Sequence, residues 1–114
     1  MSTIFSKIRD KEIPAEFLYE DEEIFAIKDI MPQANIHILI IPKKDIPTLN
    51  DITKSDTQLL GKMMLVASQL AQRFGIQDSG YRLVMNCNGD GGQTVFQLHL
   101  HLLGGEPLRG SFGN

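Results

Sequence analysis

The sequence predicts an α+β fold, in which a five-stranded antiparallel sheet is covered by one long helix and joined by a short N-terminal helix. Three strand-like segments come first, one long amphipathic segment follows, and two further strand-like segments come last. This order lacks the strict alternation of strands and helices that a parallel sheet requires. At 114 residues, the chain has the size of one compact unit, so we expect a single domain spanning residues 1–114.

The N-terminal part predicts a short helix followed by a hairpin. Residues 3–10 place apolar side chains at helical spacing, and Pro14 then interrupts the backbone donors. Residues 16–20 and 23–28 carry aromatic and β-branched side chains on either side of an acidic pair, which is typical of two strands joined by a turn. We therefore expect the first two strands in these ranges.

A third strand is expected at residues 36–42. The preceding segment, residues 31–35, has the proline and asparagine of a turn. The segment itself is rich in isoleucine and too short for a helix, so it predicts a mostly buried strand with His37 inside it. Pro42 ends this strand.

The long helix is expected to begin near Ser55 and to end near Phe74. Ser55 and Gln58 have the spacing of a capping box, and Gly75 stands where a left-handed C-terminal cap is favoured. Apolar residues recur every three or four positions and form one broad stripe. These residues are Leu59, Leu60, Met63, Val66, Ala67, Leu70 and Phe74.

Two more strands are expected after the helix. Residues 81–86 form the first, residues 87–94 form a glycine-rich loop, and residues 95–103 form the second, which Gly104 and Gly105 end. Because no strand opens through this loop into a helix, the loop does not match a Rossmann or Walker phosphate site. Consecutive backbone amides in such a loop can still form a nest for a phosphate.

The composition excludes several functional classes. The net charge of −3 argues against a nucleic-acid binder or an anionic-membrane binder, because both need a basic surface. The sequence has no apolar run of about 18 residues, the length that a membrane span needs. Cys87 is the only cysteine, so neither an intrachain disulfide nor a CxxC zinc site is available. We therefore expect a cytoplasmic protein with no membrane or nucleic-acid partner.

The last strand carries the residues with the clearest chemistry. Strand alternation predicts Phe96 and the leucines on one face, with Gln97, His99 and His101 on the other, roughly 7 Å apart. A neutral imidazole is a competent nucleophile near pH 7, and a second imidazole can donate to phosphoryl oxygens or to a leaving group. His99 and His101 match these two tasks. A single histidine here would more simply be a polar residue on a solvated sheet face.

Zinc binding is an alternative interpretation of the same histidines. His-x-His on one strand can ligate zinc together with His37, and Asp29 or Asp90 can add an oxygen. No nearby cysteine completes a tetrahedral set. The preferred interpretation therefore includes no metal and no cofactor.

Three segments together resemble the histidine triad (HIT) nucleotide-binding family, in its Hint-like branch. They are IFSKIRDKEIPA at residues 4–15, DIMPQANIHILIIPKK at residues 29–44 and NCNGDGGQTVFQLHLHLLGG at residues 86–105. The family motif alternates histidine with apolar residues, and it stands here as QLHLHLL at residues 97–103. The resemblance implies a HIT-like fold and a homodimer. It also implies hydrolysis of adenosine phosphoramidates and of acyl or lysyl adenylates to AMP, without a metal.

The resemblance also implies a role for individual residues. His99 is the nucleophile that becomes adenylylated, His101 contacts phosphate oxygens, and His37 lies behind them. The implied nucleotide-binding residues are Asp29 at the ribose hydroxyls, Phe5, Ile27 and Ile30 around the base, and Asn86, Gln93 and Thr94 on the phosphate side. Without the resemblance, Phe5, Ile27 and Ile30 would be interpreted as plain core. We expect the dimer to form through residues 56–74, with Met63 and Met64 in the contact, and through residues 81–86.

Gln97 departs from the family motif, which has its first histidine there. Glutamine donates and accepts hydrogen bonds but does not titrate, so it interrupts any proton relay that runs from His37 through this position. Three other functions therefore stay open: a nucleotide-binding or scaffold protein with weakened catalysis, a dinucleoside polyphosphate hydrolase, and a zinc-dependent module.

Overall fold

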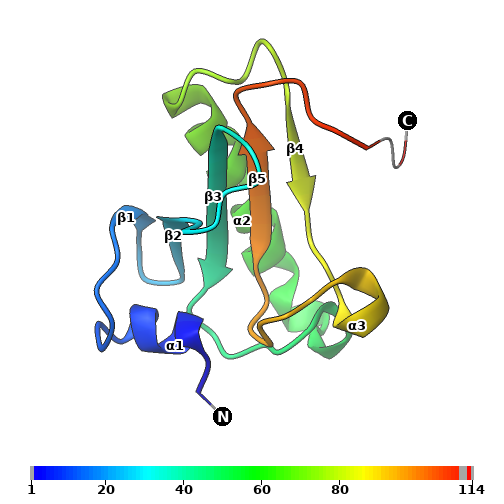
Figure 1. Cartoon of the computed structure of the whole chain (residues 1–114). Helices are drawn as coiled ribbons and strands as arrows, with labels where there is room; N and C mark the ends of the chain where they lie inside the picture. Colours follow the sequence, from blue (N-terminus) through cyan, green and yellow to red (C-terminus); the bar gives the residue numbers. More distant parts are fainter. Residues whose placement is uncertain (1, 111–112, 114) are drawn as a thin grey trace.

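The fold is an antiparallel five-stranded sheet with one long helix packed on it (Figure 1). The computed structural model describes residues 2–110 and residue 113. Its strands, β1 (Phe17–Glu20), β2 (Ile24–Lys28), β3 (Ile36–Pro42), β4 (Tyr81–Val84) and β5 (Leu100–Gly104), lie in the order β1-β2-β3-β5-β4. The α-helices are α1 (Ile4–Arg9), α2 (Thr57–Arg73) and α3 (Asn88–Gly91). The α+β prediction is confirmed. Among the described residues, none of the helices combines the length and the apolar composition of a membrane span.

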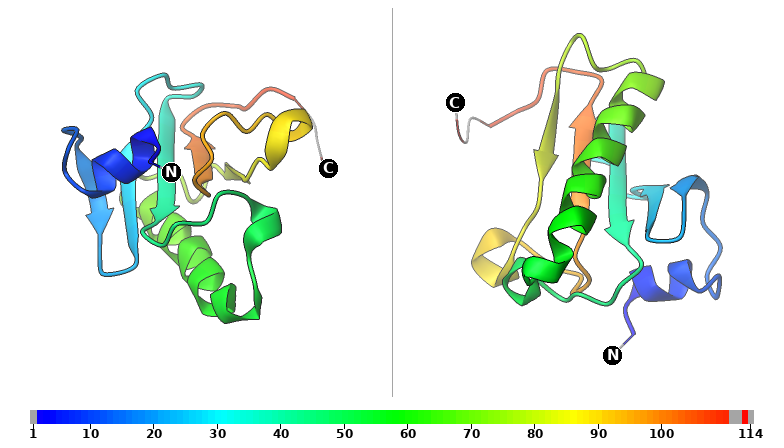
Figure 2. Two further views of the ribbon diagram at one scale, coloured as in Figure 1. Left: turned by 90° about the horizontal axis from the view of Figure 1, so that it is seen from below. Right: turned by 180° about the vertical axis from the view of Figure 1, so that it is seen from behind.

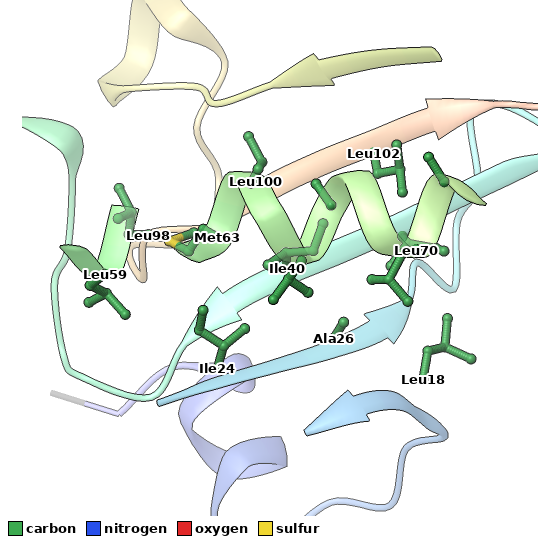
Figure 3. Close-up of a cluster of buried hydrophobic side chains, with 14 of the residues drawn as sticks. Leu18, Ile24, Ala26, Ile40, Leu59, Met63, Leu70, Leu98, Leu100 and Leu102 are labelled. Atoms are coloured by element: carbon green, nitrogen blue, oxygen red, sulfur yellow. The ribbon is translucent and has the colours of Figure 1, made fainter. Parts of the chain in front are cut away.

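Helix α2 crosses one face of the sheet over β3 and β5, and it lies in front of these strands when the molecule is seen from behind (Figure 2, right). Its apolar stripe, which includes Met63, Val66 and Leu70, packs on side chains from the strands, among them Ile40 and Leu102 (Figure 3). All five of these side chains are at most 3% exposed. Burial of this stripe is the main contact that fixes the helix on the sheet, since a fully buried large apolar side chain contributes about 1.5–3 kcal/mol.

The opposite face of the sheet is only partly covered, and this leaves room for a site. Alternate residues of β2 and β3 join the core under α2, while Phe25, Ile27, Leu39 and Ile41 pack with Phe5 and Ile8 of helix α1. Helix α1 therefore buries β2 and β3 on their second face. It does not extend over β5, where His101 lies on the same face as Leu39 of β3. In Figure 1, α1 and α3 lie on either side of the segment that leads into β5.

Helix α2 has the predicted C-terminus but a different N-terminus. Gly75 has φ +73°, and Ile76 N–H donates to the Ala71 carbonyl at 2.9 Å, which makes a Schellman cap. The predicted Ser55–Gln58 capping box is wrong. The capping box lies two residues earlier, where the Asp56 carboxylate accepts from Thr53 N–H at 2.9 Å. A short 3-10 turn, Lys54–Asp56, therefore precedes the helix.

The last two strands are shorter than predicted. Strand β4 ends at Val84 rather than at residue 86, and β5 begins at Leu100 rather than at residue 95. Pairing with β3 stops at Ile40↔Leu100, and beyond it Leu98 N–H donates to the carbonyl of Ile46 at 2.7 Å. The alternation predicted for the leucines holds, since Leu98, Leu100 and Leu102 are buried under α2. It fails for Phe96, which is 48% exposed.

Candidate active site

A cavity of about 880 Å³ opens on the face of the sheet opposite α2. Its walls come from α1, from the end of β2 and the turn after it, from β5, and from the loop before β5. Most of the predicted site residues line it, namely Phe5, Ile27, Asp29, Ile30, Asn86, Thr94, His99 and His101. Sequence segments far apart thus meet around one space of the size that a small-molecule ligand occupies.

One end of the cavity is apolar. Phe5 and Ile27 form its buried wall, at 8% and 4% exposure, whereas Ile30 at the rim is 90% exposed. The plain-core alternative is therefore wrong for Ile30. Further apolar lining residues that the sequence did not single out are Ile4, Ile8, Met31, Pro32, Leu39 and Val95. An apolar slot with an exposed apolar rim suits a flat, weakly polar group such as a nucleobase.

The His99 ring is held by a main-chain carbonyl. Its Nδ1 lies 2.7 Å from the carbonyl oxygen of Gln97, and a carbonyl only accepts, so Nδ1 carries the proton. The lone pair is then on Nε2. The edge of the ring packs against Phe5 with centroids 4.9 Å apart, and the side chain is 7% exposed. His99 is therefore a neutral, oriented imidazole in a narrow slot, and the alternative of a polar residue on a solvated sheet face is wrong for it.

His37 and His101 form a directed pair. The Gln33 backbone N–H donates to His37 Nδ1 at 3.1 Å, so His37 must carry its proton on Nε2. His37 Nε2 lies 2.9 Å from His101 Nδ1 and donates to it. His101 then carries its own proton on Nε2. The ring of His101 is 5.0 Å from that of His99, centroid to centroid. The site thus holds one imidazole with a free lone pair beside one with a free N–H.

All three histidines have their pKa lowered, chiefly by burial. Desolvation lowers the pKa of His99, although the hydrogen bond to Gln97 and the charge of Asp29 oppose it. Burial lowers the pKa of His101 to about 4, with a further contribution from the neighbouring imidazoles. Burial also lowers the pKa of His37, and Asp29 partly offsets this. The imidazoles are therefore neutral near pH 7, as nucleophilic attack requires.

Asp29, His37 and His101 bring three potential metal ligands together, with ligand atoms within 4.8 Å of one another. The hydrogen bond from Gln33 argues against the zinc alternative. A neutral His37 that binds a metal through Nε2 must place its proton on Nδ1, which already accepts a backbone N–H. The cluster fits a hydrogen-bonded relay better. Asp29 Oδ2 lies 3.4 Å from His37 Nε2, and Asp29 Oδ1 accepts from Met31 N–H.

The glycine-rich loop differs from the predicted phosphate nest. Residues 88–91 form the short helix α3, and the N–H groups of Gly92 and Gln93 donate to the carbonyls of Gly89 and Asn88. These two amides are occupied, so the nest prediction is wrong for them. The polar groups of this loop that line the cavity are Asn86 and the exposed Thr94.

Three predicted site residues lie outside the cavity lining: the buried His37, which bonds to His101, and the residues Gln93 and Gln97. The Gln93 side chain is 6% exposed and bonds to Asn88 N–H and to the carbonyls of Pro47 and Val95, so it shapes the loop. The Gln97 side chain points into the segment 42–46 rather than toward His37. A proton relay from His37 does not run through position 97, as the glutamine there predicts, because His37 is paired with His101. A direct catalytic role for the Gln97 amide finds no support in this arrangement.

Gln33 is a site residue that the sequence did not reveal. It contributes through its backbone N–H, and any residue except proline has that group. No side-chain pattern could have identified it.

Comparison with known proteins relates this geometry to a family. A family model described as the HIT domain matches residues 10–108. The purine nucleoside phosphoramidase of Escherichia coli (strain K12) is 53% identical over 106 residues, which cover 93% of this chain and 89% of that protein. A HIT family hydrolase from Legionella pneumophila Philadelphia 1 is 49% identical with a TM-score of 0.93, covering 95% and 96% of the two chains. A HIT family hydrolase from Clostridium thermocellum is 44% identical with a TM-score of 0.92, covering 96% of each chain.

Proposed function

The chain belongs to the HIT domain family and is a hydrolase, and we propose that it hydrolyses purine nucleoside phosphoramidates to a nucleoside monophosphate through His99. Acyl and lysyl adenylates belong to the same substrate class, because each has a leaving group on the α-phosphorus of AMP. The observation that carries the proposal is the single tautomer of His99, which places a lone pair on Nε2 without any general base.

In the proposed complex the base of the nucleotide lies at the apolar end of the cavity and the phosphate at the histidine end. The purine lies in the apolar slot between Phe5, Ile27 and Ile30, and Asp29 at the end of β2 accepts hydrogen bonds from the ribose hydroxyls. The phosphoryl group then reaches His99 and His101. The similarity to the Escherichia coli phosphoramidase supports this substrate class.

The reaction proceeds in two displacements. His99 Nε2 attacks phosphorus and the phosphorus–nitrogen bond breaks, which gives a nucleotidyl-imidazole and an amine. The departing nitrogen takes a proton from solvent, and the exposed Thr94 hydroxyl on the rim can pass it on. Water then attacks phosphorus, His99 regains its lone pair, and the water releases a proton that replaces the one consumed.

His101 acts as a hydrogen-bond donor throughout. Its neutral ring keeps the proton on Nε2, because Nδ1 is occupied by the N–H of His37. An N–H aimed at the phosphoryl oxygens stabilises the charge that develops on them, and such donors are worth about 10²–10³ in rate in comparable sites.

Turnover of adenosine phosphoramidate by the wild-type protein and by His99→Ala tests the proposal. We expect AMP release from the wild type and none from the variant, with AMP still bound by both. Diadenosine tetraphosphate serves as the second substrate. Faster cleavage of the dinucleotide would favour a polyphosphate hydrolase, and AMP binding without turnover of either compound would favour the scaffold function.

A further inference from the structure

Gln97 uses its entire side-chain amide on one neighbouring segment. Nε2 donates to the carbonyls of Pro42 and Lys44 at 2.9 and 2.8 Å, and Oε1 accepts from Ile46 N–H at 3.2 Å. The residue is 4% exposed. Both donors and the carbonyl oxygen therefore satisfy backbone groups, and two of these groups belong to the buried residues Pro42 and Ile46. The bond from Leu98 N–H to the Ile46 carbonyl adds a fourth link between the same two segments.

The main chain of Gln97 contacts the nucleophile. Its carbonyl oxygen accepts from His99 Nδ1 at 2.7 Å. This carbonyl lies just outside strand β5, so no ladder bond to β3 holds it in place. Its position depends instead on the contacts of segment 96–98 with segment 42–46, and the Gln97 amide supplies most of these.

Segment 42–46 is also tied to the cavity wall. Arg9 of helix α1 donates from Nη1 to the Lys43 carbonyl at 2.9 Å and to Asp45 Oδ1 at 2.7 Å. The same helix carries Phe5, whose ring packs against His99. One short segment thus connects the helix that bounds the apolar slot to the carbonyl that orients the nucleophile.

We infer that Gln97 is a positioning residue, which clamps segment 42–46 to segment 96–98 and so holds the His99 imidazole with its lone pair on Nε2. The inference rests on the proposed function of His99. In this role the glutamine, which replaces the first histidine of the family motif, does not need to gain or lose a proton. A neutral histidine there offers one donor and one acceptor, so it can satisfy only part of the same backbone set.

Gln97→Leu tests the inference, because leucine keeps most of the volume and removes all three side-chain hydrogen bonds. We expect kcat to fall by about tenfold to a hundredfold, the range that misplacement of a reacting group by about 1 Å produces. The KM for adenosine phosphoramidate should stay within about twofold, since the apolar slot is intact. In ¹⁵N NMR of the histidine rings, the Nδ1–H form of His99 should lose its predominance.

Thr48→Val is the matched control. Thr48 is also buried, at 7% exposed, and its hydroxyl donates to Asp51 and accepts from Asn50 N–H without any contact with a histidine. It should lower the urea midpoint and leave kcat and the His99 tautomer unchanged. Gln97→His should retain more activity than Gln97→Leu, and it keeps the test valid if the leucine variant does not fold.

The outcomes separate the inference from the proposed function. Wild-type kcat and an unchanged His99 tautomer in Gln97→Leu would overturn the inference, as would an equal loss of kcat in Thr48→Val. A wild-type protein that does not turn over any phosphoramidate would instead overturn the proposed function. The tautomer measurement needs no turnover, so it tests the positioning role in either case.

Discussion

At the scale of single residues, main-chain groups decide what each histidine can do. The Gln97 carbonyl places the proton of His99 on Nδ1, and the Gln33 N–H places the proton of His37 on Nε2. The pair from His37 to His101 then leaves the N–H of His101 free for a phosphoryl oxygen. The proposed nucleophile, His99, and the proposed donor, His101, therefore differ in their hydrogen-bond partners rather than in residue type.

Acid should destabilise the protein earlier than its carboxylates alone would. The pKa of His101 falls from 6.5 to about 4 in the fold, and the pKa values of His37 and His99 are also lowered. As the pH drops below about 6.5, the histidines bind protons in the unfolded chain before they do so in the folded protein. The free energy of unfolding is therefore highest above pH 6.5 and declines as the pH falls toward about 4.

Urea midpoints measured from about pH 7.5 to about pH 5 check this prediction, because carboxylates titrate mostly below that range. We expect the midpoint of the wild type to fall across it. His101→Asn is the control and should show a shallower decline. A flat wild-type profile would show that the buried imidazoles do not keep their lowered pKa values.

At the scale of elements, the sequence predicted those whose signals are local. The isoleucine-rich strand, Ile36–Pro42, and the cap at Gly75 follow directly from their residues. The start of β5 could not be read, because the alternation of residues 96–102 continues past the point where β3 stops offering partners. The same alternation wrongly placed the Gln97 side chain on the face that carries His99 and His101. Its buried contacts depend on segment 42–46, which is remote in sequence.

Gly75→Ala should destabilise the fold by about 1 kcal/mol, the cost of a left-handed conformation for a residue with a Cβ. The added Cβ meets no atom within 4 Å, so strain is the only expected effect. Chemical denaturation checks the value. Gly75→Asn is the matched control and should lose less, because asparagine tolerates this conformation better. Equal stability of the alanine variant and the wild type would contradict the cap assignment.

At the scale of the whole molecule, one sheet separates a packed face from a functional one. Helix α2 lies on the first face, and α1 lies on the second (Figure 2). Helix α1 covers only β2 and β3, and the cavity opens beside β5. Strand β4 forms one edge of the sheet. Met64 and Leu65 of α2 are exposed apolar residues. Met63, which we expected at a subunit contact, is instead 1% exposed and belongs to the core.

We predict a homodimer that forms through α2 and the edge strand β4. Association of two chains through these elements would cover Met64, Leu65 and the unpaired edge of β4 together. Light scattering at micromolar concentration should give twice the chain mass. Leu65→Glu should shift the protein toward the monomer, whereas Leu49→Glu, on a separate surface segment, should not. A monomeric mass for the wild type would refute the prediction.

The proposed reaction requires that His99 Nε2 becomes covalently attached to the nucleotide. Mass spectrometry of the protein, quenched in base during turnover of adenosine phosphoramidate, tests it most directly, because a phosphorus–nitrogen bond to imidazole resists base. We expect an adenylyl adduct on the peptide that contains His99, and no adduct in His99→Ala. An adduct on another residue, or steady AMP release without any adduct in rapidly quenched samples, would contradict it.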